Sequence, residues 1–372
     1  MRFAIITHVP HGSSKNHYFA YAPYVREMNI WIQFADEVEI IAPSGLTKKN
    51  AIDLDYVHEN IELSSIKSMD LLGFKAMLLS FLNTPKTLYK IFQAMRKADH
   101  IHLRCPGNIG LLGCFVQILF PKKNKTAKYA GNWDPNARQP FTYRLQKWIL
   151  NNTFLTRNIK VLVYGQWHGA SKNIEPFFTA TYRETDKKKI ETRSLNDTIN
   201  FLFVGTLSPG KRPLYALQLI EKLVEKGIKV SLDLFGEGSE RIMLEKYCVS
   251  KNLGGIVHFH GNQREVIVRK AYQQSHCLLL PSKSEGWPKV VAEAMFWGVL
   301  PLASNVSCIS FMIGAGSRGI ILTMDLDLDV AQIVKILKDQ PQYQQKVLES
   351  VSWSQKYTLD LFENQIKAFM QK

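Results

Sequence analysis

The residues best suited to chemistry lie where an apolar run gives way to a helical pattern, in the segment 281–295, PSKSEGWPKVVAEAM. Pro288 suits the first position of a helix, because its missing N–H would have no partner there. The N–H groups from Lys289 onward would then point, with the positive end of the helix dipole, at whatever lies above the end of the preceding strand. We therefore expect an anion site of the kind that holds phosphate groups.

Two carboxylates flank this anion site. Glu285 precedes Pro288 by three residues, and Glu293 follows it by five, which places Glu293 roughly 7 to 8 Å along the helix axis. Carboxylates accept hydrogen bonds from vicinal hydroxyls, so one could hold a ribose and the other a second sugar. Taken alone, the pair is equally well a capping residue and a surface residue of one helix.

Two further motifs follow predicted strands. In the segment 201–213, FLFVGTLSPGKRP, the cations Lys211 and Arg212 stand at a helix start. Cations oppose the dipole there, so their placement indicates an anion, although a solvated pair is the simpler interpretation of these two alone. Gly236 and Gly238 form a Gly-x-Gly pair at the end of the next strand, where they either approach a ligand or satisfy a turn with positive φ.

The surrounding pattern is typical of parallel sheets with crossover helices. A helix begins at Pro213 and stops at Gly227. In the C-terminal half the expected strands are 200–204, 230–235, 256–260, 276–280, 300–303 and 319–322. In the N-terminal half they are 3–7, 38–42, 100–104 and 160–163.

A chain of 372 residues exceeds the usual size of one core, so we expect two domains. The polar stretch 181–198 has the composition of a linker. We therefore place a Rossmann-like acceptor-side domain in 1–190 and a second Rossmann-like domain in 191–352. The helical segment 353–372 is expected to pack back across both.

The formal net charge of +15 is unevenly distributed. Residues 1–190 hold 26 Lys and Arg against 14 Asp and Glu, a net charge of +12, whereas residues 191–372 hold 21 against 18, a net charge of +3. The N-terminal half is therefore expected to face phospholipid, lipid pyrophosphate or nucleic acid. Hydrophobic residues at 46% and charged residues at 21% exclude a disordered chain.

Neither a metal site nor a membrane span is predicted. The five cysteines include no CxxC pair and no metal-ligand spacing, which fits a reducing cytoplasm. The stretch 71–82 falls short of the roughly 20 residues that a spanning helix needs. The segment 74–96 mixes apolar and basic residues, and it is either a helix lying on an anionic bilayer or a core helix with a solvated basic face.

In this order the motifs make residues 198–325 resemble the donor domain of the retaining GT-B glycosyltransferases of family 4. The matching motifs are Val204-Gly205-x-Leu207-(x)3-Lys211, Gly236-x-Gly238, Phe259-x-Gly261, Pro281-Ser282-x-Ser284-Glu285-Gly286 and Glu293-Ala294-Met295-(x)2-Gly298. The resemblance implies an α/β protein with two Rossmann-like domains facing a central cleft. It also implies a nucleotide-sugar donor, transfer with retention of the anomeric configuration, and neither a cofactor nor an obligatory metal.

The resemblance also assigns roles to residues. Lys211 would contact the diphosphate in place of a metal, Glu285 the donor sugar, and Glu293 the ribose. Lys211 and Glu285 are the catalytic candidates. The donor-binding candidates are Gly12, Gly205, Lys211, Arg212, Gly236, Gly238, Glu285, Gly286, Trp287, Pro288, Lys289 and Glu293.

The chain departs from the family pattern at Thr206, where an arginine is common; Arg212 is the candidate to supply that charge. The N-terminal glycine-rich loop is reduced to Gly12 and its neighbours. In the region where family members present acceptor or catalytic side chains, the candidates are Asn132, Trp133 and Asp134, which ordinary turn chemistry would explain equally well.

These observations predict transfer of a hexose-type unit to a glycan or lipid-linked acceptor, in surface-polysaccharide synthesis, at the cytoplasmic face of the membrane. A nucleotide-sugar epimerase on the same scaffold is the first alternative. A basic nucleic-acid-binding protein is the second, although its cations are dispersed and no recognition motif accompanies them, so no nucleic acid is expected. No G-x-G-x-x-G follows the first strand of either half, which argues against a NAD-dependent oxidoreductase.

Overall fold

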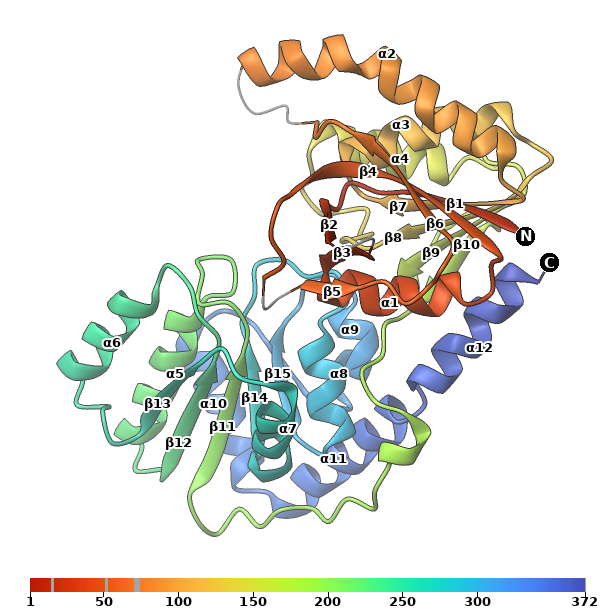
Figure 1. Ribbon diagram of the computed structural model, residues 1–372. Helices are drawn as coiled ribbons and strands as arrows, with labels where there is room; N and C mark the ends of the chain where they lie inside the picture. The colour runs from red at the N-terminus through yellow and green to blue at the C-terminus, as the bar shows by residue number, and fades with distance from the viewer. Residues whose placement is uncertain (15–16, 51–52, 70–73, 372) are drawn as a thin grey trace. The chain divides into compact units, whose positions relative to one another are not determined.

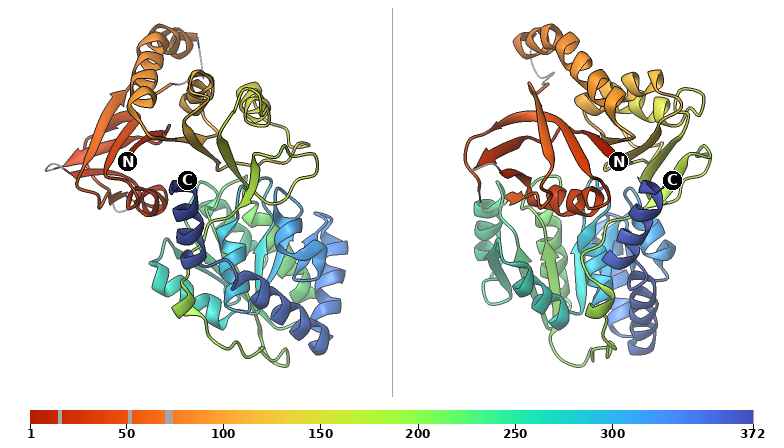
Figure 2. Two further views of the ribbon diagram at one scale, coloured as in Figure 1. Left: turned by 90° about the vertical axis from the view of Figure 1, so that its right-hand side faces the viewer. Right: turned by 45° about the vertical axis from the view of Figure 1, so that its right-hand side comes forward.

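The computed structural model describes residues 1–14, 17–50, 53–69 and 74–371, and it leaves the side chains of 74–81 undescribed. The chain forms two compact units. The N-terminal unit comprises residues 1–177 together with 362–372, and the C-terminal unit comprises 178–361. Each unit is an α/β domain built on a largely parallel sheet with helices on both faces (Figures 1 and 2).

The sheet of the N-terminal unit is doubly wound. Its parallel strands run in the spatial order β6-β4-β1-β7-β8-β9-β10, so the order reverses between β1 and β7. The hairpin of β2 and β3, followed by β5, extends the sheet beyond β4. The strands are β1 (Arg2–Ile6), β2 (His11–Ser14), β3 (His17–Tyr21), β4 (Glu37–Leu46), β5 (Asp53–Asp55), β6 (Ile61–Ile66), β7 (His100–Cys105), β8 (Asn124–Tyr129), β9 (Ile159–Tyr164) and β10 (Ile174–Phe177).

Helices cover both faces of this sheet. One face packs against α2 (Phe74–Lys97), α3 (Asn108–Val116) and α4 (Phe141–Leu150) through an apolar core. The other face packs against α1 (Ala22–Ile32) and α12 (Leu359–Met370). There Trp31 of α1 stacks on Phe3, and Phe362 of α12 lies 5.2 Å from Phe177, centroid to centroid.

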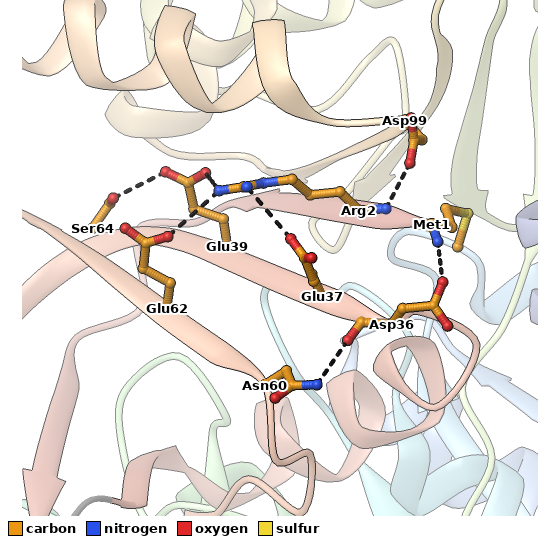
Figure 3. A network of polar contacts seen from close by, with 9 residues as sticks. All are labelled: Met1, Arg2, Asp36, Glu37, Glu39, Asn60, Glu62, Ser64 and Asp99. Atoms are coloured by element: carbon orange, nitrogen blue, oxygen red, sulfur yellow. Dashed lines mark hydrogen bonds and ion pairs between the residues drawn. The ribbon is translucent and has the colours of Figure 1, made fainter.

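A polar network ties the amino ends of β1, β4 and β6 together (Figure 3). The Arg2 guanidinium lies 2.9 Å from the Glu39 carboxylate and 3.4 Å from both Glu37 and Glu62. The Arg2 N–H donates to Asp99 at 2.7 Å, next to the start of β7. On this part of the amino edge, the cation is therefore matched by several carboxylates.

The C-terminal unit has six parallel strands in the order β13-β12-β11-β14-β15-β16. This is the strand order of dinucleotide-binding folds, and it reverses between β11 and β14. The strands are β11 (Ile199–Val204), β12 (Val230–Phe235), β13 (Val257–Gly261), β14 (Cys277–Leu280), β15 (Leu300–Ser304) and β16 (Ile320–Leu322). The helices are α5 (Pro213–Glu225), α6 (Arg241–Ser250), α7 (Glu265–Gln274), α8 (Lys289–Phe296), α9 (Ile309–Met312), α10 (Leu326–Leu337) and α11 (Gln340–Ser354). All six expected strands of this half are confirmed to within one residue at each end.

The polar stretch that we interpreted as a linker belongs to the C-terminal unit, and the two units divide between Phe177 and Phe178. The Arg193 guanidinium donates to the carbonyls of Gly298, at 2.8 Å, and Gln273, at 2.7 Å. These bonds fasten the stretch to the ends of α7 and α8. Its polarity therefore reflects attachment to a helical surface, which composition does not distinguish from a free loop.

Two helix boundaries were wrong. Helix α8 begins at Lys289 with Pro288 as its N-cap, one residue later than expected. The segment 353–372 is two helices instead of one: α11 ends at Ser354 and α12 begins at Leu359. The Thr358 hydroxyl accepts a hydrogen bond from the Leu361 N–H at 3.3 Å, which starts a new helix there. From Phe362 onward the chain belongs to the N-terminal unit.

Helix α2 spans the whole of the basic, apolar stretch 74–96. Ile91, Ala94 and Met95 are buried in the core, whereas Leu82 and Tyr89 are 66% and 63% exposed. The side chains of Leu78, Leu79 and Phe81 lie outside the described residues, as does the start of the 71–82 stretch. Within the described ranges, no helix combines the length and the apolar character needed to span a membrane.

Candidate active site

The site candidates of the C-terminal unit converge on the switch point of its sheet. The loop after β11 carries Lys211 and the loop after β14 carries Glu285. Because β11 and β14 are neighbours at the point where the strand order reverses, both loops flank the crevice in which open α/β sheets bind ligands. A backbone hydrogen bond from the Lys283 N–H to the Gly210 carbonyl, at 2.8 Å, joins the two loops directly.

Lys211 and Glu285 form an ion pair. Nζ of Lys211 lies 2.5 Å from Oε1 of Glu285, and the side chains are 29% and 9% exposed. The structure thus brings together the two residues that the sequence analysis named as catalytic candidates. A cation and a carboxylate thus lie within hydrogen-bond distance of each other at the carboxyl edge of the sheet.

The glycines Gly236 and Gly238 hold the loop that carries Lys211. A Cβ on Gly236 would lie 1.9 Å from the Gly205 carbonyl oxygen, and one on Gly238 would lie 2.2 Å from that of Leu207. The N–H groups of Gly205 and Leu207 donate to the carbonyls of Phe235 and Glu237. These glycines therefore permit two backbone segments to touch, whatever else they contact.

The start of α8 leaves backbone donors available. The Val291 N–H bonds to the Pro288 carbonyl at 3.0 Å, but the N–H groups of Lys289 and Val290 have no hydrogen-bond partner in the described part of the chain. The Gly286 carbonyl accepts from the Ser307 hydroxyl at 3.0 Å, which fixes the preceding loop. An anion placed above β14 would meet these two free amides at the positive end of the helix.

Glu293 is held in place by two hydroxyl groups. Thr181 donates to Oε1 at 2.7 Å and Tyr272 donates to Oε2 at 3.0 Å. Tyr272 is fully buried, and burial together with the negative charge of Glu293 raises the pKa of its phenol well above the usual value. A carboxylate has about four acceptor positions, so two remain for hydroxyl groups of a ligand.

Two other donor-binding candidates, Arg212 and Trp287, have positions that the local structure explains. Arg212 is the N-cap of α5 with a left-handed φ of 51°, and no ion pair engages its guanidinium within the described residues. Trp287 is only 7% exposed, and its ring lies 5.9 Å from that of Tyr357. Trp287 is therefore part of an aromatic cluster below the loop, and little of its ring is available to a ligand.

In the N-terminal unit, Gly12 and the acceptor candidates occupy packed positions. A Cβ on Gly12 would lie 2.2 Å from the Phe19 ring in the β2–β3 hairpin. Trp133 is 5% exposed and packs edge-on against Tyr129. Asn132 and Asp134 each accept a backbone N–H two residues ahead, at 2.9 and 2.8 Å, which is the turn chemistry that competed with an acceptor role.

Sequence reasoning missed a group of buried charges at the carboxyl edge of the N-terminal sheet. Glu27 of α1 lies 2.6 Å from Arg104 at the end of β7 and 2.9 Å from Lys128 of β8. Burial alone would raise the pKa of Glu27, but the two cations hold it at about 2. The available signal was a cation within a predicted buried strand, Arg104 at the end of 100–104. Among the described residues, no group of three His, Cys, Asp or Glu side chains could hold a metal ion.

The comparisons with known proteins agree with this geometry. The lipopolysaccharide outer core galactosyltransferase WaaB, in its apo form, aligns over 100% of this chain and 99% of its own, with 16% identity and a TM-score of 0.70. HepE of Anabaena in complex with UDP gives 13% identity and a TM-score of 0.70 over 100% and 99%. Sucrose-phosphate synthase from Thermosynechococcus elongatus is 17% identical, with a TM-score of 0.65, and the alignment covers 100% of this chain and 98% of that one. The chain therefore has the two-domain GT-B fold of glycosyltransferases.

The sequence comparisons point the same way. Residues 183–349 match the family model of the glycosyl transferases group 1. The α-D-kanosaminyltransferase of Streptomyces kanamyceticus is 23% identical over 172 residues, which span 45% of this chain and 45% of that relative. The predicted GT-B fold is thus confirmed, and the segment that matches the group 1 model contains Lys211, Glu285 and Glu293.

Proposed function

We propose that the protein is a retaining glycosyltransferase that needs no metal. In this proposal the C-terminal unit holds a nucleotide-sugar donor, and the N-terminal unit binds a glycan or lipid-linked acceptor in surface-polysaccharide synthesis. The observation that carries the proposal is the ion pair of Lys211 and Glu285 at the switch point of the sheet. A nucleotide-sugar diphosphate needs a cation and a sugar needs a hydrogen-bond acceptor, and this pair supplies both.

The chain's own residues supply the electrostatics of such a transfer. The bond between the sugar carbon and the diphosphate oxygen breaks with its electron pair going to the diphosphate, the acceptor oxygen bonds to the sugar carbon, and the acceptor's proton passes to the leaving diphosphate. Lys211, Arg212 and the amides at the start of α8 would stabilise the negative charge that develops on the leaving diphosphate. Glu285 would orient the sugar and Glu293 the ribose. This fixed positive charge does the work for which other enzymes use a metal ion.

The names of similar proteins agree with this chemistry. HepE binds UDP, WaaB is a galactosyltransferase of the lipopolysaccharide outer core, and the kanosaminyltransferase transfers a sugar. These names support the proposal that this chain uses a nucleotide-sugar donor and a carbohydrate acceptor.

We further propose that the N-terminal unit rests on the inner face of an anionic membrane, where a lipid-linked acceptor would be reached. Large apolar side chains protrude from the helical layer of this unit: Leu119 after α3 is 65% exposed, Trp148 of α4 is 60% exposed, and Phe154 is 72% exposed. Basic residues stand among them, including Arg144, Lys147 and Arg157. Aromatic and basic groups together favour an interfacial position.

The decisive experiment is a thermal-unfolding assay of wild type, Lys211→Ala and Glu293→Ala against a panel of nucleotides and nucleotide sugars. A ligand that binds the native state raises its unfolding temperature. We expect one nucleotide family to stabilise the wild type and both substitutions to abolish the shift. The absence of any shift at millimolar ligand would overturn the donor site.

The product of the reaction then distinguishes a retaining glycosyltransferase from the alternative functions. With the stabilising donor and a lipid-linked glycan, NMR of the new anomeric carbon should show the donor's configuration retained. Donor turnover without any acceptor, giving an altered nucleotide sugar, would support the epimerase instead. Salt-dependent oligonucleotide binding that persists in Glu293→Ala would support a nucleic-acid-binding protein.

A further inference from the structure

We propose that the N-terminal unit has a second anion site, a pocket at the amino edge of its sheet that binds a phosphate-bearing ligand. The pocket has a volume of about 610 Å³. It lies at the amino ends of β7, β8 and β9, beside Phe369 of α12. Open α/β sheets bind their substrates at the carboxyl ends of the strands. This pocket is therefore separate from the donor site and from the carboxyl edge of its own sheet.

The charge of the pocket is positive and unbalanced. Four cations line it, Lys125, Arg157, Lys160 and Lys172, and no described Asp or Glu is among the lining residues. Only Lys160 has an ion-pair partner in the described part of the chain, namely Glu175, which is partly exposed. A concave surface lined by one sign of charge concentrates the field and attracts ions of the opposite sign.

Another part of the amino edge of this sheet has a different charge balance from the pocket. Under β1, β4 and β6, the Arg2 guanidinium is matched by Glu37, Glu39 and Glu62 (Figure 3). Under β7, β8 and β9, the cations that line the pocket outnumber the acids around it, and only Lys160 among them has an ion-pair partner in the described residues.

One of the cations, Lys125, is buried and held in a fixed position. Nζ of Lys125 donates to the carbonyls of Phe120, at 2.8 Å, and Gln117, at 3.3 Å, which leaves one of its three N–H groups. Burial lowers the pKa of Lys125 to about 8, so its ammonium group is still mostly charged at pH 7 and would be stabilised by an anion. The Arg157 guanidinium lies 4.9 Å from the centre of the Phe154 ring, which orients its planar fork.

These features define the ligand class. Arginine binds phosphate oxygens in pairs, and lysine adds point charges around them. Pockets of about 300 to 1,000 Å³ hold small molecules, so this volume accepts a phosphomonoester or a diphosphate together with a small organic group. Such a ligand is either a soluble phosphorylated molecule or the headgroup of a phospholipid, and the phosphate is common to both.

The test uses inorganic pyrophosphate as the probe and isothermal titration calorimetry as the measurement. All proteins carry Lys211→Ala, which weakens the proposed donor site. Pyrophosphate binding in this experiment therefore reports on the pocket, and its absence would leave the proposed donor site untouched. The pocket variant adds Arg157→Glu and Lys172→Glu, both at exposed positions. The matched control adds Arg26→Glu and Lys48→Glu, two exposed cations of the same unit outside the pocket.

We expect saturable binding to the Lys211→Ala protein, unchanged affinity in the control, and at least a tenfold loss in the pocket variant, in line with the removal of two close charges. No saturable binding, or an equal loss in the control, would overturn the proposal. If the pocket variant fails to unfold cooperatively, Lys172→Ala is the substitute, with an expected loss of several-fold.

A second arm identifies the source of the phosphate. Sedimentation with phosphatidylglycerol vesicles, against phosphatidylcholine vesicles, measures headgroup binding. A loss of phosphatidylglycerol binding in the pocket variant, together with the loss of pyrophosphate binding, supports a lipid headgroup. Unchanged vesicle binding with lost pyrophosphate binding supports a soluble ligand. Retained binding of both probes contradicts the site.

Discussion

Lys211 and Glu285 lie 74 residues apart in the chain, yet their charged atoms are 2.5 Å apart. The contact exists because β11 and β14, which precede the two loops, pair in parallel at the switch point of the C-terminal sheet. A donor diphosphate must therefore compete with Glu285 for Lys211, or share it. The ion pair prepositions the lysine and keeps both side chains ordered before a ligand arrives.

Replacing Lys211 should impair transfer much more than folding. We expect Lys211→Met to lower kcat/KM by about 10²- to 10³-fold, because it removes a charge aimed at the leaving group. The unfolding free energy should change by about 1 kcal/mol or less, since the pair is partly solvated. The matched control is Lys222→Met, which breaks the exposed pair of Lys222 with Glu225. Equal rates for the two variants would contradict the role of Lys211.

The glycine pair leads to a prediction about folding. In Gly238→Ala, the new methyl group would stand 2.2 Å from the Leu207 carbonyl oxygen, so the loops after β11 and β12 must separate. We expect a loss of about 1 to 3 kcal/mol of unfolding free energy in urea. Gly254→Ala is the control, because no atom lies within 4 Å of its added Cβ. Similar stabilities would show that the contact relaxes at little cost.

The strands of the C-terminal unit could be predicted well from the sequence because most of their side chains are buried. Strand β14 is covered on both faces, so it appears as an unbroken apolar run that ends at a proline, whereas β12 shows the alternation of a strand with one face more buried than the other. The motifs at their carboxyl ends then placed Lys211 and Glu285 in one site. The doubly wound topology links the order of strands in the sequence to their order in the sheet, and so it places the two loops side by side.

The N-terminal unit shows why the rest could not be predicted. Strand β8 was missed because its sequence, NKTAKY, is mostly polar although nearly all of its residues are buried. Burial of Lys128 depends on Glu27, which lies on α1 and neutralises it. The side chains that hold Glu293 were missed for the same reason. Thr181 and Tyr272 are ordinary residues until the fold places them against the carboxylate.

Glu27 leads to a prediction about pH. Its folded-state pKa, about 2, lies below the reference value of 4.5, so its contribution to stability is complete above about pH 4.5 and is lost as the pH falls towards 2. The contribution should be about 3 kcal/mol. At pH 7, Glu27→Gln should cost about 3 to 5 kcal/mol, because Arg104 and Lys128 are left buried without a counter-charge.

The measurement is urea unfolding of wild type and Glu27→Gln from pH 7 to pH 2.5. The gap between their unfolding free energies should narrow below pH 4.5. The control is Glu62→Gln, whose carboxylate is 65% exposed beside Arg2. A gap for Glu27→Gln that stays constant with pH would show that folding does not lower the pKa of this carboxylate.

The hydroxyl groups around Glu293 separate a positioning role from a structural one. Tyr272→Phe removes one hydrogen bond to the carboxylate, and we expect the KM for the donor to rise by about two- to tenfold with kcat nearly unchanged. Glu293→Gln should raise the same KM by at least about tenfold, since a bond to a charged acceptor is worth more. The control is Tyr343→Phe, a buried tyrosine of the same unit whose hydroxyl donates to the His276 carbonyl at 3.1 Å. That substitution should lower the unfolding temperature and leave the KM as it is. If Tyr343→Phe raises the KM as much as Tyr272→Phe does, the two effects are structural, and Glu293 is not oriented by Tyr272 for binding.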